Sequence, residues 1–296
     1  MRIFIIEIFI FFLFVCSTSF SKTYNIAVIP KGSTHDFWLE VEKGALKAGK
    51  EFGANVIFRG PTYDNDTKTQ IKAVDYFIQQ KVDAIVLAPN HKIDLIDIVE
   101  EALAAHIKVI IIDSGLDSNS YQSFIATDNF MAGKLAGKKL ANIINNKGNV
   151  GIIKYYVGNA STELREAGFL EAMKENKIPV IVNEYGGATI GLTLKKGLEI
   201  LEKKPNIVGL FTPNESSTIG MAKALERSNL HKQIALVGFD YNSEIQNMMK
   251  KGLIKGVIVQ QPEQMGYLGV KTAIESLDGE KINKKIVVDS KFIISK

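Results

Sequence analysis

The chain has 296 residues, of which 46% are hydrophobic and 23% charged, as in an ordinary globular protein of one or two domains. This composition excludes an intrinsically disordered chain. Its net charge of +4 comes from 36 basic and 32 acidic residues scattered along the sequence, which argues against a nucleic-acid-binding protein.

The N-terminal 21 residues differ from the rest of the chain. A basic second residue precedes a predominantly apolar run over 3–15, and mostly small residues follow up to Ser21. This pattern is typical of a secretory signal peptide, so we expect residues 1–21 to be removed and the protein to be exported to the periplasm. The alternative is a lipid anchor at Cys16, although Val15 stands where a lipoprotein signal usually carries a small residue. Because Cys16 is the only cysteine, cleavage after Ser21 leaves no thiol for a disulfide or a metal site.

Short apolar runs recur along the mature chain. Several are apolar at consecutive positions, as in Val109–Ile112, which is typical of strands buried on both faces by helices. We expect strands, in chain order, at Tyr24–Pro30, Asn55–Phe58, Asp83–Ala88, Lys108–Ile112, Ser123–Ala126, Asn149–Tyr155, Val180–Glu184, Ile207–Phe211, Gln233–Phe239 and Gly256–Val259.

The segments between these runs have helical spacing. In the first of them, Phe37, Val41 and Ala45 recur at four-residue steps and lie on one stripe of a helix. We expect helices at Phe37–Phe52, Lys68–Gln80, Ile93–Ala105, Asn129–Ile144, Thr162–Glu175, Thr189–Lys203, Ser216–Arg227, Ser243–Lys250 and Gln264–Leu277.

The order strand–helix–strand repeats throughout, which predicts an α/β protein with right-handed crossovers and parallel sheets. Ten strands are many for one open sheet, so two doubly wound sheets of about half that size are expected. The series of βα units restarts near Thr127–Asn129, and no long linker or low-complexity tract separates the two halves.

Polar and aromatic side chains follow the predicted strands. In open parallel sheets ligands bind beyond the carboxyl ends of the strands, and aromatic faces combined with hydrogen-bonding groups suit a sugar ring. Each candidate also has a structural alternative, because Phe37 and Trp38 fit a core, Asp113 and Asp240 fit a turn or cap, and Asn214 fits a helix N-cap. The candidates at these positions are Lys31, His35, Phe37, Trp38, Asn90, Asp113, Asn214, Asp240 and Gln260.

Signatures of enzymes are missing from the sequence. No dinucleotide-binding glycine motif or nucleophile elbow occurs, and the four histidines lack the spacing of metal ligands. The segment Gly133–Lys139 imitates a phosphate-binding loop, but it lacks the Ser or Thr and falls inside a predicted helix. We therefore expect no catalytic residue, no metal and no cofactor.

Taken in order, the motifs of the chain resemble those of the periplasmic sugar-binding proteins of bacterial ABC transporters, of the ribose-, allose- and galactose-binding type. The resemblance covers nearly all of residues 22–296 and implies the type I periplasmic binding protein fold. The segments that carry it are Asp36–Trp38, Ile85–Pro89, Ile110–Asp113, Ala126–Asn129, Arg165–Phe169, Asn214–Glu215, Val237–Asp240 and Val259–Pro262.

The resemblance implies two lobes that close over a ligand. The N-terminal lobe would comprise 22–127 plus 261–284 and the C-terminal lobe 128–260 plus 285–296, joined by a hinge of three crossings near Thr127, Gln260 and Lys284. It also implies that Phe37 and Trp38 stack on the sugar, whose hydroxyls would bind Asp113, Arg165, Asn214, Asp240 and Gln260.

Three residues depart from the ribose-type pattern. Ser114 stands where an Arg often follows the Asp, and Lys31 and His35 stand where neutral residues are common. We therefore expect Lys31 to supply the cation of the site, which disfavours ribose and leaves room for an acidic or modified sugar.

The resemblance implies that the protein is not an enzyme and that it delivers a small sugar to the membrane permease of an ABC transporter. No nucleic-acid partner is expected, because no DNA-binding helix-turn-helix precedes the lobes, and a monomer is expected. The alternatives are a sensor that presents a sugar to a membrane receptor and a sugar-acting enzyme.

Overall fold

The computed structural model describes residues 23–33 and 35–295. The predicted signal peptide and the alternative lipid anchor at Cys16 lie outside these residues. Within the described ranges, no helix has both the length and the apolar character needed to cross a bilayer.

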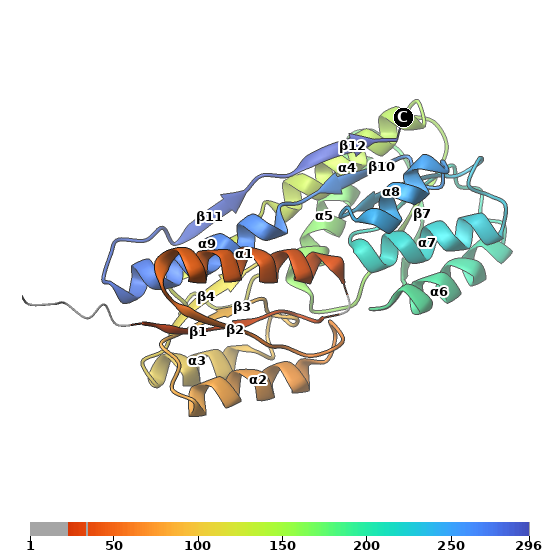
Figure 1. Ribbon diagram of the computed structural model, residues 1–296. Coiled ribbons are helices and arrows are strands. Elements are labelled where there is room, and N and C mark those ends of the chain that lie inside the picture. The colour runs from red at the N-terminus through yellow and green to blue at the C-terminus, as the bar shows by residue number, and fades with distance from the viewer. Residues whose placement is uncertain (1–22, 34, 296) are drawn as a thin grey trace, which may run out of the picture.

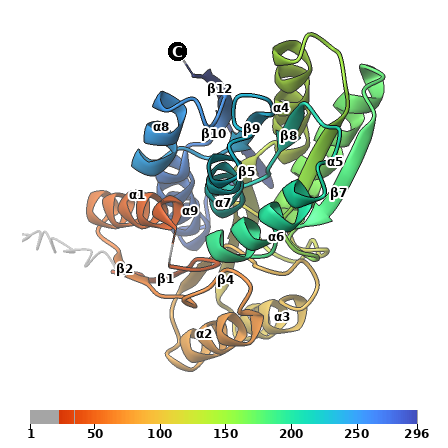
Figure 2. The same cartoon turned by 90° about the vertical axis from the view of Figure 1, so that its right-hand side faces the viewer.

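Two lobes make up the protein, each built on a six-stranded sheet (Figure 1). The first sheet has the order β11-β5-β4-β3-β1-β2, and all of its neighbouring strands are parallel. Helices α1 and α9 cover one face of this sheet and α2 and α3 the other (Figure 2). The elements of this lobe are β1 (Asn25–Ile29), α1 (Asp36–Phe52), β2 (Asn55–Phe58), α2 (Thr67–Gln79), β3 (Ala84–Leu87), α3 (Ile96–Ala104), β4 (Lys108–Ile112), β5 (Ser123–Thr127), α9 (Pro262–Leu277) and β11 (Lys285–Val288).

The second sheet repeats this arrangement with the order β12-β10-β9-β8-β6-β7, except that β12 runs antiparallel to β10. Helices α4 and α5 cover one face, and α6, α7 and α8 cover the other. Its elements are α4 (Asn129–Ile143), β6 (Val150–Lys154), α5 (Ala160–Glu175), β7 (Val180–Tyr185), α6 (Ile190–Glu202), β8 (Gly209–Phe211), α7 (Glu215–Arg227), β9 (Ala235–Phe239), α8 (Ser243–Lys250), β10 (Gly256–Val259) and β12 (Lys291–Ile294).

The predicted α/β architecture of two parallel-sheet lobes is confirmed, and one boundary is corrected. The prediction ended the N-terminal lobe at Lys284, but Lys285–Val288 forms β11, which pairs with Phe124–Thr127 of β5 in the first sheet. The third crossing therefore lies between β11 and β12, at Asp289 and Ser290. β11 was not expected because its apolar run is only three residues long, follows a polar, lysine-rich stretch and belongs to a half-exposed edge strand.

Helices α4 and α5 pack with their backbones in direct contact. A Cβ added to Gly133 would lie 1.9 Å from the carbonyl oxygen of Arg165, and one added to Gly168 would lie 2.0 Å from that of Phe130. Two glycines at reciprocal positions thus let the helices approach each other, and this approach fixes the depth of Arg165. The glycine that imitated a phosphate-binding loop in the sequence is a packing residue in the fold.

The same device joins α1 to α9, which are far apart in the sequence. A Cβ on Gly44 would lie 1.8 Å from the carbonyl oxygen of Glu263, and one on Gly266 would lie 2.0 Å from that of Val41. The contact holds α9, which follows the second crossing, against the first helix of the chain. Each lobe therefore has a helix pair held together by reciprocal glycines.

We expect Gly133→Ala to destabilise the protein by about 1–3 kcal/mol, because the added methyl group meets backbone and the helices have to separate. Gly191→Ala is the matched control, because no atom lies within 4 Å of a Cβ at that position of α6, and it should stabilise by about 0.5–1 kcal/mol. Urea unfolding of both variants measures the difference. Equal effects of the same sign would contradict the packing role of Gly133.

Candidate functional site

The carboxyl ends of the central strands of both sheets face each other across a cleft between the lobes. A cavity there retains about 30 Å³ of free space and is enclosed by side chains of both lobes. We call this cavity the inner site. It is lined by Lys31, His35, Phe37, Trp38, Asp64, Asp113, Tyr155, Asn159, Ser161, Thr162, Arg165, Asn214, Glu215, Asp240 and Gln260.

Nine of the ten residues that the sequence singled out line the inner site, and Asn90 does not. Asn90 follows β3 and is fully buried, and its carbonyl oxygen accepts a hydrogen bond of 2.9 Å from the hydroxyl of Tyr156. No hydrogen-bond partner within the described part of the chain reaches its side-chain Oδ1 or Nδ2. The structure thus places the backbone of Asn90, rather than its amide group, in contact with the second lobe.

Arg165 is the most deeply held cation of the inner site, with a side chain only 3% exposed. Its Nε donates to Oδ1 of Asn129 at 2.7 Å, its Nη1 to the carbonyl of Pro213 at 2.9 Å and its Nη2 to Oε1 of Gln260 at 2.9 Å. Its guanidinium also stacks 4.0 Å from the centre of the Phe239 ring. Arg165 is therefore not a solvated charge on the surface of its helix.

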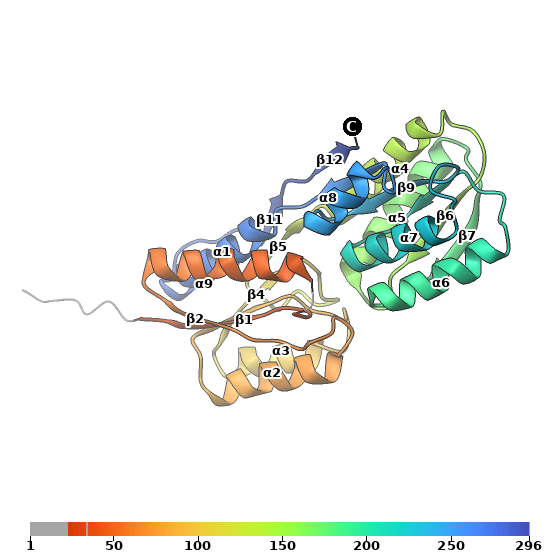
Figure 3. The same cartoon turned by 45° about the vertical axis from the view of Figure 1, so that its right-hand side comes forward.

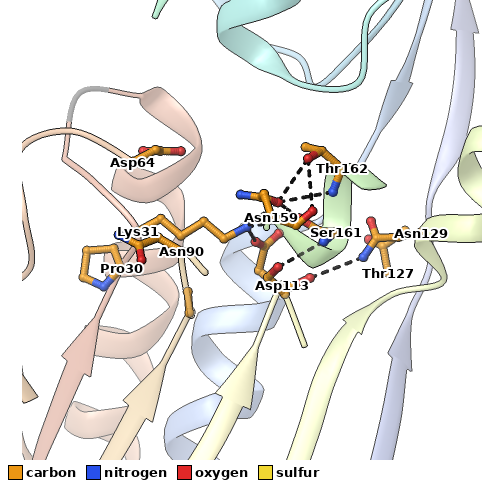
Figure 4. Close-up of polar contacts among 12 residues, drawn as sticks. Pro30, Lys31, Asp64, Asn90, Asp113, Thr127, Asn129, Asn159, Ser161 and Thr162 are labelled. Atoms are coloured by element: carbon orange, nitrogen blue, oxygen red, sulfur yellow. Dashed lines mark hydrogen bonds and ion pairs between the residues drawn. The ribbon is translucent and has the colours of Figure 1, made fainter. Parts of the chain in front are cut away.

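Lys31 reaches from the end of β1 to both lobes (Figure 4). Its ammonium lies 2.6 Å from Oδ2 of Asp113 in its own lobe and donates to Oγ of Ser161 at 3.0 Å in the other. Ser114, which stands where the related pattern has Arg, accepts a hydrogen bond of 3.0 Å from the backbone N–H of Ser161. The nearest cation to Asp113 is thus Lys31, followed by Arg165 at 3.8 Å, while Ser114 joins the lobes.

Two of the acidic residues hold a left-handed backbone conformation. Asp113 follows β4 with φ of 60°, and Asp240 follows β9 with φ of 70°. The two strands occupy equivalent positions in the two sheets, so the carboxylates enter the cleft from opposite sides. Backbone strain of this kind concentrates at functional sites, where surrounding contacts hold the residue in place. For Asp240 these contacts are hydrogen bonds from Nε2 of Gln260 at 2.7 Å and from the backbone N–H of Glu215 at 2.8 Å.

A second charged cluster surrounds Asp64, which the sequence did not single out. Nδ1 of His35 lies 3.4 Å from its carboxylate, and Trp38 Nε1 and the Tyr155 hydroxyl donate to the same group at 3.2 and 3.3 Å. Burial by itself lowers the pKa of His35, but the charge and hydrogen bond of Asp64 outweigh it, and the pKa rises to about 9. At neutral pH His35 is therefore a cation paired with Asp64.

Glu215 joins the lobes at the other side of the inner site. Helix α1 begins after His35, which provides no side-chain cap, and its N-terminal end points at the second lobe (Figure 3). The carboxylate of Glu215 accepts hydrogen bonds from the backbone N–H groups of Asp36 and Phe37, at 3.4 and 3.3 Å. These groups lie in the first turn of α1, where they have no partner within the helix. Asn214, next to Glu215, caps its own helix α7, as its alternative interpretation predicted, and lines the cavity as well.

Sequence reasoning missed several lining residues for identifiable reasons. Asp64 lies in an irregular segment after β2, which has no apolar run to mark a strand end. Asn159, Ser161 and Thr162 form the first turn of α5, where they resemble an ordinary cap. Their place after β6 was the one available signal, because the strand-end rule applies to that strand as well.

We expect lobe closure to depend on pH through Glu215. Burial raises the pKa of Glu215 to about 7 in the closed structure, with His35, Asp240 and Asp36 as its charged neighbours. An opened cleft returns this carboxyl to water and towards its usual pKa of 4.5, so the closed form binds more protons. Closure should therefore strengthen as the pH falls from about 7 towards 4.5, by at most tenfold per pH unit.

Small-angle X-ray scattering between pH 5 and 8 measures this opening. Glu215→Gln should remove most of the pH dependence, whereas the control Glu40→Gln, at an exposed position of α1, should retain it. If lobe closure in the Glu215 variant depends on pH as it does in the unaltered protein, another group is responsible for the pH dependence.

The geometry agrees with comparisons to known proteins. The profile of the family described as "Periplasmic binding protein domain" matches residues 26–281. The chain is 28% identical over 267 residues to the ribose import binding protein RbsB of Bacillus subtilis, covering 90% of this chain and 85% of that protein.

Solved structures of sugar-transport binding proteins are similar to this chain as well. The chain is similar to the periplasmic component of an ABC-type sugar transport system from Hahella chejuensis, at 36% identity and a TM-score of 0.88 over 90% of this chain and 99% of that one. It is also similar to a carbohydrate transporter solute binding protein from Agrobacterium radiobacter in complex with D-arabinose, at 31% identity and a TM-score of 0.89 over 93% of this chain and 95% of that one. The protein belongs to the periplasmic binding protein family and has the type I fold.

Proposed function

We propose that the protein binds one small neutral sugar between its lobes and delivers it, chemically unchanged, to the membrane permease of an ABC transporter. We propose further that it acts in the periplasm as a monomer. The observation that carries this proposal is the inner site itself, in which two aromatic rings and a set of buried donors and acceptors from both lobes surround one cavity. The names of its relatives, which include a ribose import protein and a D-arabinose complex, support it.

The lining groups match the chemistry of a sugar. Phe37 and Trp38 meet edge to face with ring centres 4.9 Å apart, so they offer apolar surfaces to the C–H faces of a ring. Carboxylates, amides and ammonium groups surround them and suit hydroxyls, which both donate and accept. Hydrogen bonds to charged groups contribute about 1.5–3 kcal/mol each, so a few of them reach the roughly −8 kcal/mol of micromolar binding.

The charge balance favours a neutral sugar over the acidic one that the sequence left open. The inner site holds three cations, Lys31, His35 and Arg165, and each lies close to a carboxylate of the site. Asp64, Asp113, Asp240 and Glu215 supply at most four negative charges, because burial raises the pKa of both Asp240 and Glu215. An ionised ligand would disturb these buried pairs, and an unpaired buried charge is costly.

Entry of a ligand requires the lobes to separate. The free volume of about 30 Å³ holds about two water molecules, which is less than a sugar ring needs. Hydrogen bonds between the lobes, such as those of Lys31, Glu215 and Tyr156, close the cleft on several sides. Rotation about the three crossings would open it, as in hinge closure around other ligands.

We expect a bound sugar to change the fluorescence of Trp38, the only tryptophan of the chain. Trp38 is 3% exposed, its Nε1 donates to Asp64, and its side chain lines the inner site, so ligand contact and lobe closure both alter its surroundings. A titration with D-ribose, D-arabinose, D-allose and D-galactose, checked by calorimetry, measures this change. A sugar that binds by calorimetry without altering the emission would remove Trp38 from the site.

Arg165→Ala should weaken sugar binding by about 2–5 kcal/mol, because it leaves buried polar partners such as Gln260 unpaired. Lys134→Ala, which removes a partly exposed cation paired with Glu175 on the outer side of the lobe, is the control and should leave the affinity unchanged. Calorimetry gives the affinities, and thermal unfolding shows whether each variant is folded. A folded Arg165→Ala protein with unaltered affinity would refute the role given to this residue, and recovery of a modified sugar would refute binding without turnover.

A further inference from the structure

A second cavity adjoins the inner site, between the N-terminal ends of α1 and α8 and the end of β10. It has a free volume of about 290 Å³, compared with about 30 Å³ in the inner site. We call it the outer cavity. It is lined by Asp36, Phe37, Leu39, Glu40, Glu215, Asp240, Tyr241, Asn242, Ser243, Val259, Gln260 and Pro262.

The two cavities share four lining residues, Phe37, Glu215, Asp240 and Gln260, which therefore form the boundary between them. Across this boundary, the carboxylate of Glu215 meets the start of α1 through two long hydrogen bonds of 3.4 and 3.3 Å. Bonds at this length are weak, so a group attached to a ligand can replace them at little cost. The boundary therefore separates the two cavities by side chains that can move rather than by packed backbone.

The outer cavity continues to the surface of the protein. Leu39 on α1 is 55% exposed and Tyr241 after β9 is 40% exposed, and they belong to different lobes. A group that projects from the inner site past Glu215 would contact both lobes and still reach solvent. The outer cavity therefore limits the size of this projecting group less strictly than the inner site limits the size of the sugar ring.

The chemistry of the outer cavity differs from that of the inner site. Neither Lys nor Arg occurs among the residues that line it, whereas four carboxylates do, those of Asp36, Glu40, Glu215 and Asp240. Glu40 also contacts Lys43 at 3.2 Å, so its charge is partly neutralised. The carboxylate of Asp36 and the ionised fractions of Glu215 and Asp240, whose pKa values burial raises, oppose an anion. The apolar surfaces of Leu39, Tyr241, Val259 and Pro262 accept a short aliphatic or aromatic group.

We propose that the outer cavity is a second subsite, which receives a neutral or amine-bearing substituent of the sugar held in the inner site. The ligands of this protein then include substituted sugars such as glycosides or amino-alkyl derivatives, and they exclude sugars that carry an anionic group at the same position. This inference rests on the proposed sugar-binding function and adds the class of substituent that the site accepts.

The test uses the free monosaccharide that binds most tightly in the panel of D-ribose, D-arabinose, D-allose and D-galactose. Its mono-O-(2-aminoethyl) and mono-O-carboxymethyl derivatives, prepared at each hydroxyl in turn, are compared by calorimetry. At one position, the aminoethyl derivative should bind within threefold of the free sugar and at least tenfold more tightly than the carboxymethyl derivative. The two substituents are similar in size, so the ratio reports the charge of the cavity.

Two variants locate the effect. Ser243→Trp, at the first residue of α8, should fill the outer cavity and weaken the aminoethyl derivative at least tenfold while the free sugar changes less than threefold. Ser120→Trp, at an exposed loop position that lines neither cavity, should leave both affinities unchanged.

The outcomes separate this inference from the function on which it rests. If free sugars bind but every derivative is rejected, the second subsite is refuted and the sugar-binding function stands. The same conclusion follows if the aminoethyl and carboxymethyl derivatives bind with equal affinity. The subsite is also refuted if Ser243→Trp weakens the free sugar as much as the derivative. If no free sugar of the panel binds, the proposed function fails and the second subsite fails with it.

Discussion

The buried guanidinium of Arg165 is the interaction on which the geometry of the cleft depends. A charge removed from water has to be surrounded by hydrogen-bond partners, and Arg165 finds them in Asn129, Pro213 and Gln260. Asn129 and Gln260 lie at the first and second crossings between the lobes, and Thr127 also donates to Gln260 at 2.9 Å. One side chain therefore fixes the positions of two hinge segments, and the same side chain lines the ligand cavity. Binding and hinge motion act on a common set of atoms.

The repetition of one sheet topology explains why the site contains pairs of similar groups. Asp113 and Asp240 follow equivalent strands of the two sheets, and both adopt a left-handed backbone conformation that Asp tolerates better than most residues. Each lobe also buries a cation, and both cations lie near Asp113: Lys31 of the first lobe at 2.6 Å and Arg165 of the second, across the cleft, at 3.8 Å. Closing the cleft thus places the guanidinium of the second lobe beside an aspartate of the first. Neither half encloses a ligand alone, so affinity and closure are coupled.

The strand-end rule located most of the site from the sequence, and its failures have physical causes. Lys31, Asp113 and Asp240 follow apolar runs that mark strands clearly, and the structure places all three in the inner site. Asn90 meets the same rule, yet its side chain does not line the cavity, which a position in the chain cannot reveal. Asp64 was not found because no strand ends beside it. Its role depends on His35, Trp38 and Tyr155, which approach it only in the folded protein.

The sequence by itself determined the α/β architecture, because apolar runs such as Val109–Ile112, typical of strands that helices cover on both faces, alternate with segments of helical spacing. It also determined that aromatic and polar groups gather at strand ends. Only the tertiary structure decided that Lys285–Val288 completes the first sheet, because so short and half-exposed an edge strand is defined by its pairing with β5. The contact of Glu215 with α1 and the outer cavity likewise exist only where the two lobes meet, since burial and hydrogen bonding between distant segments follow from packing.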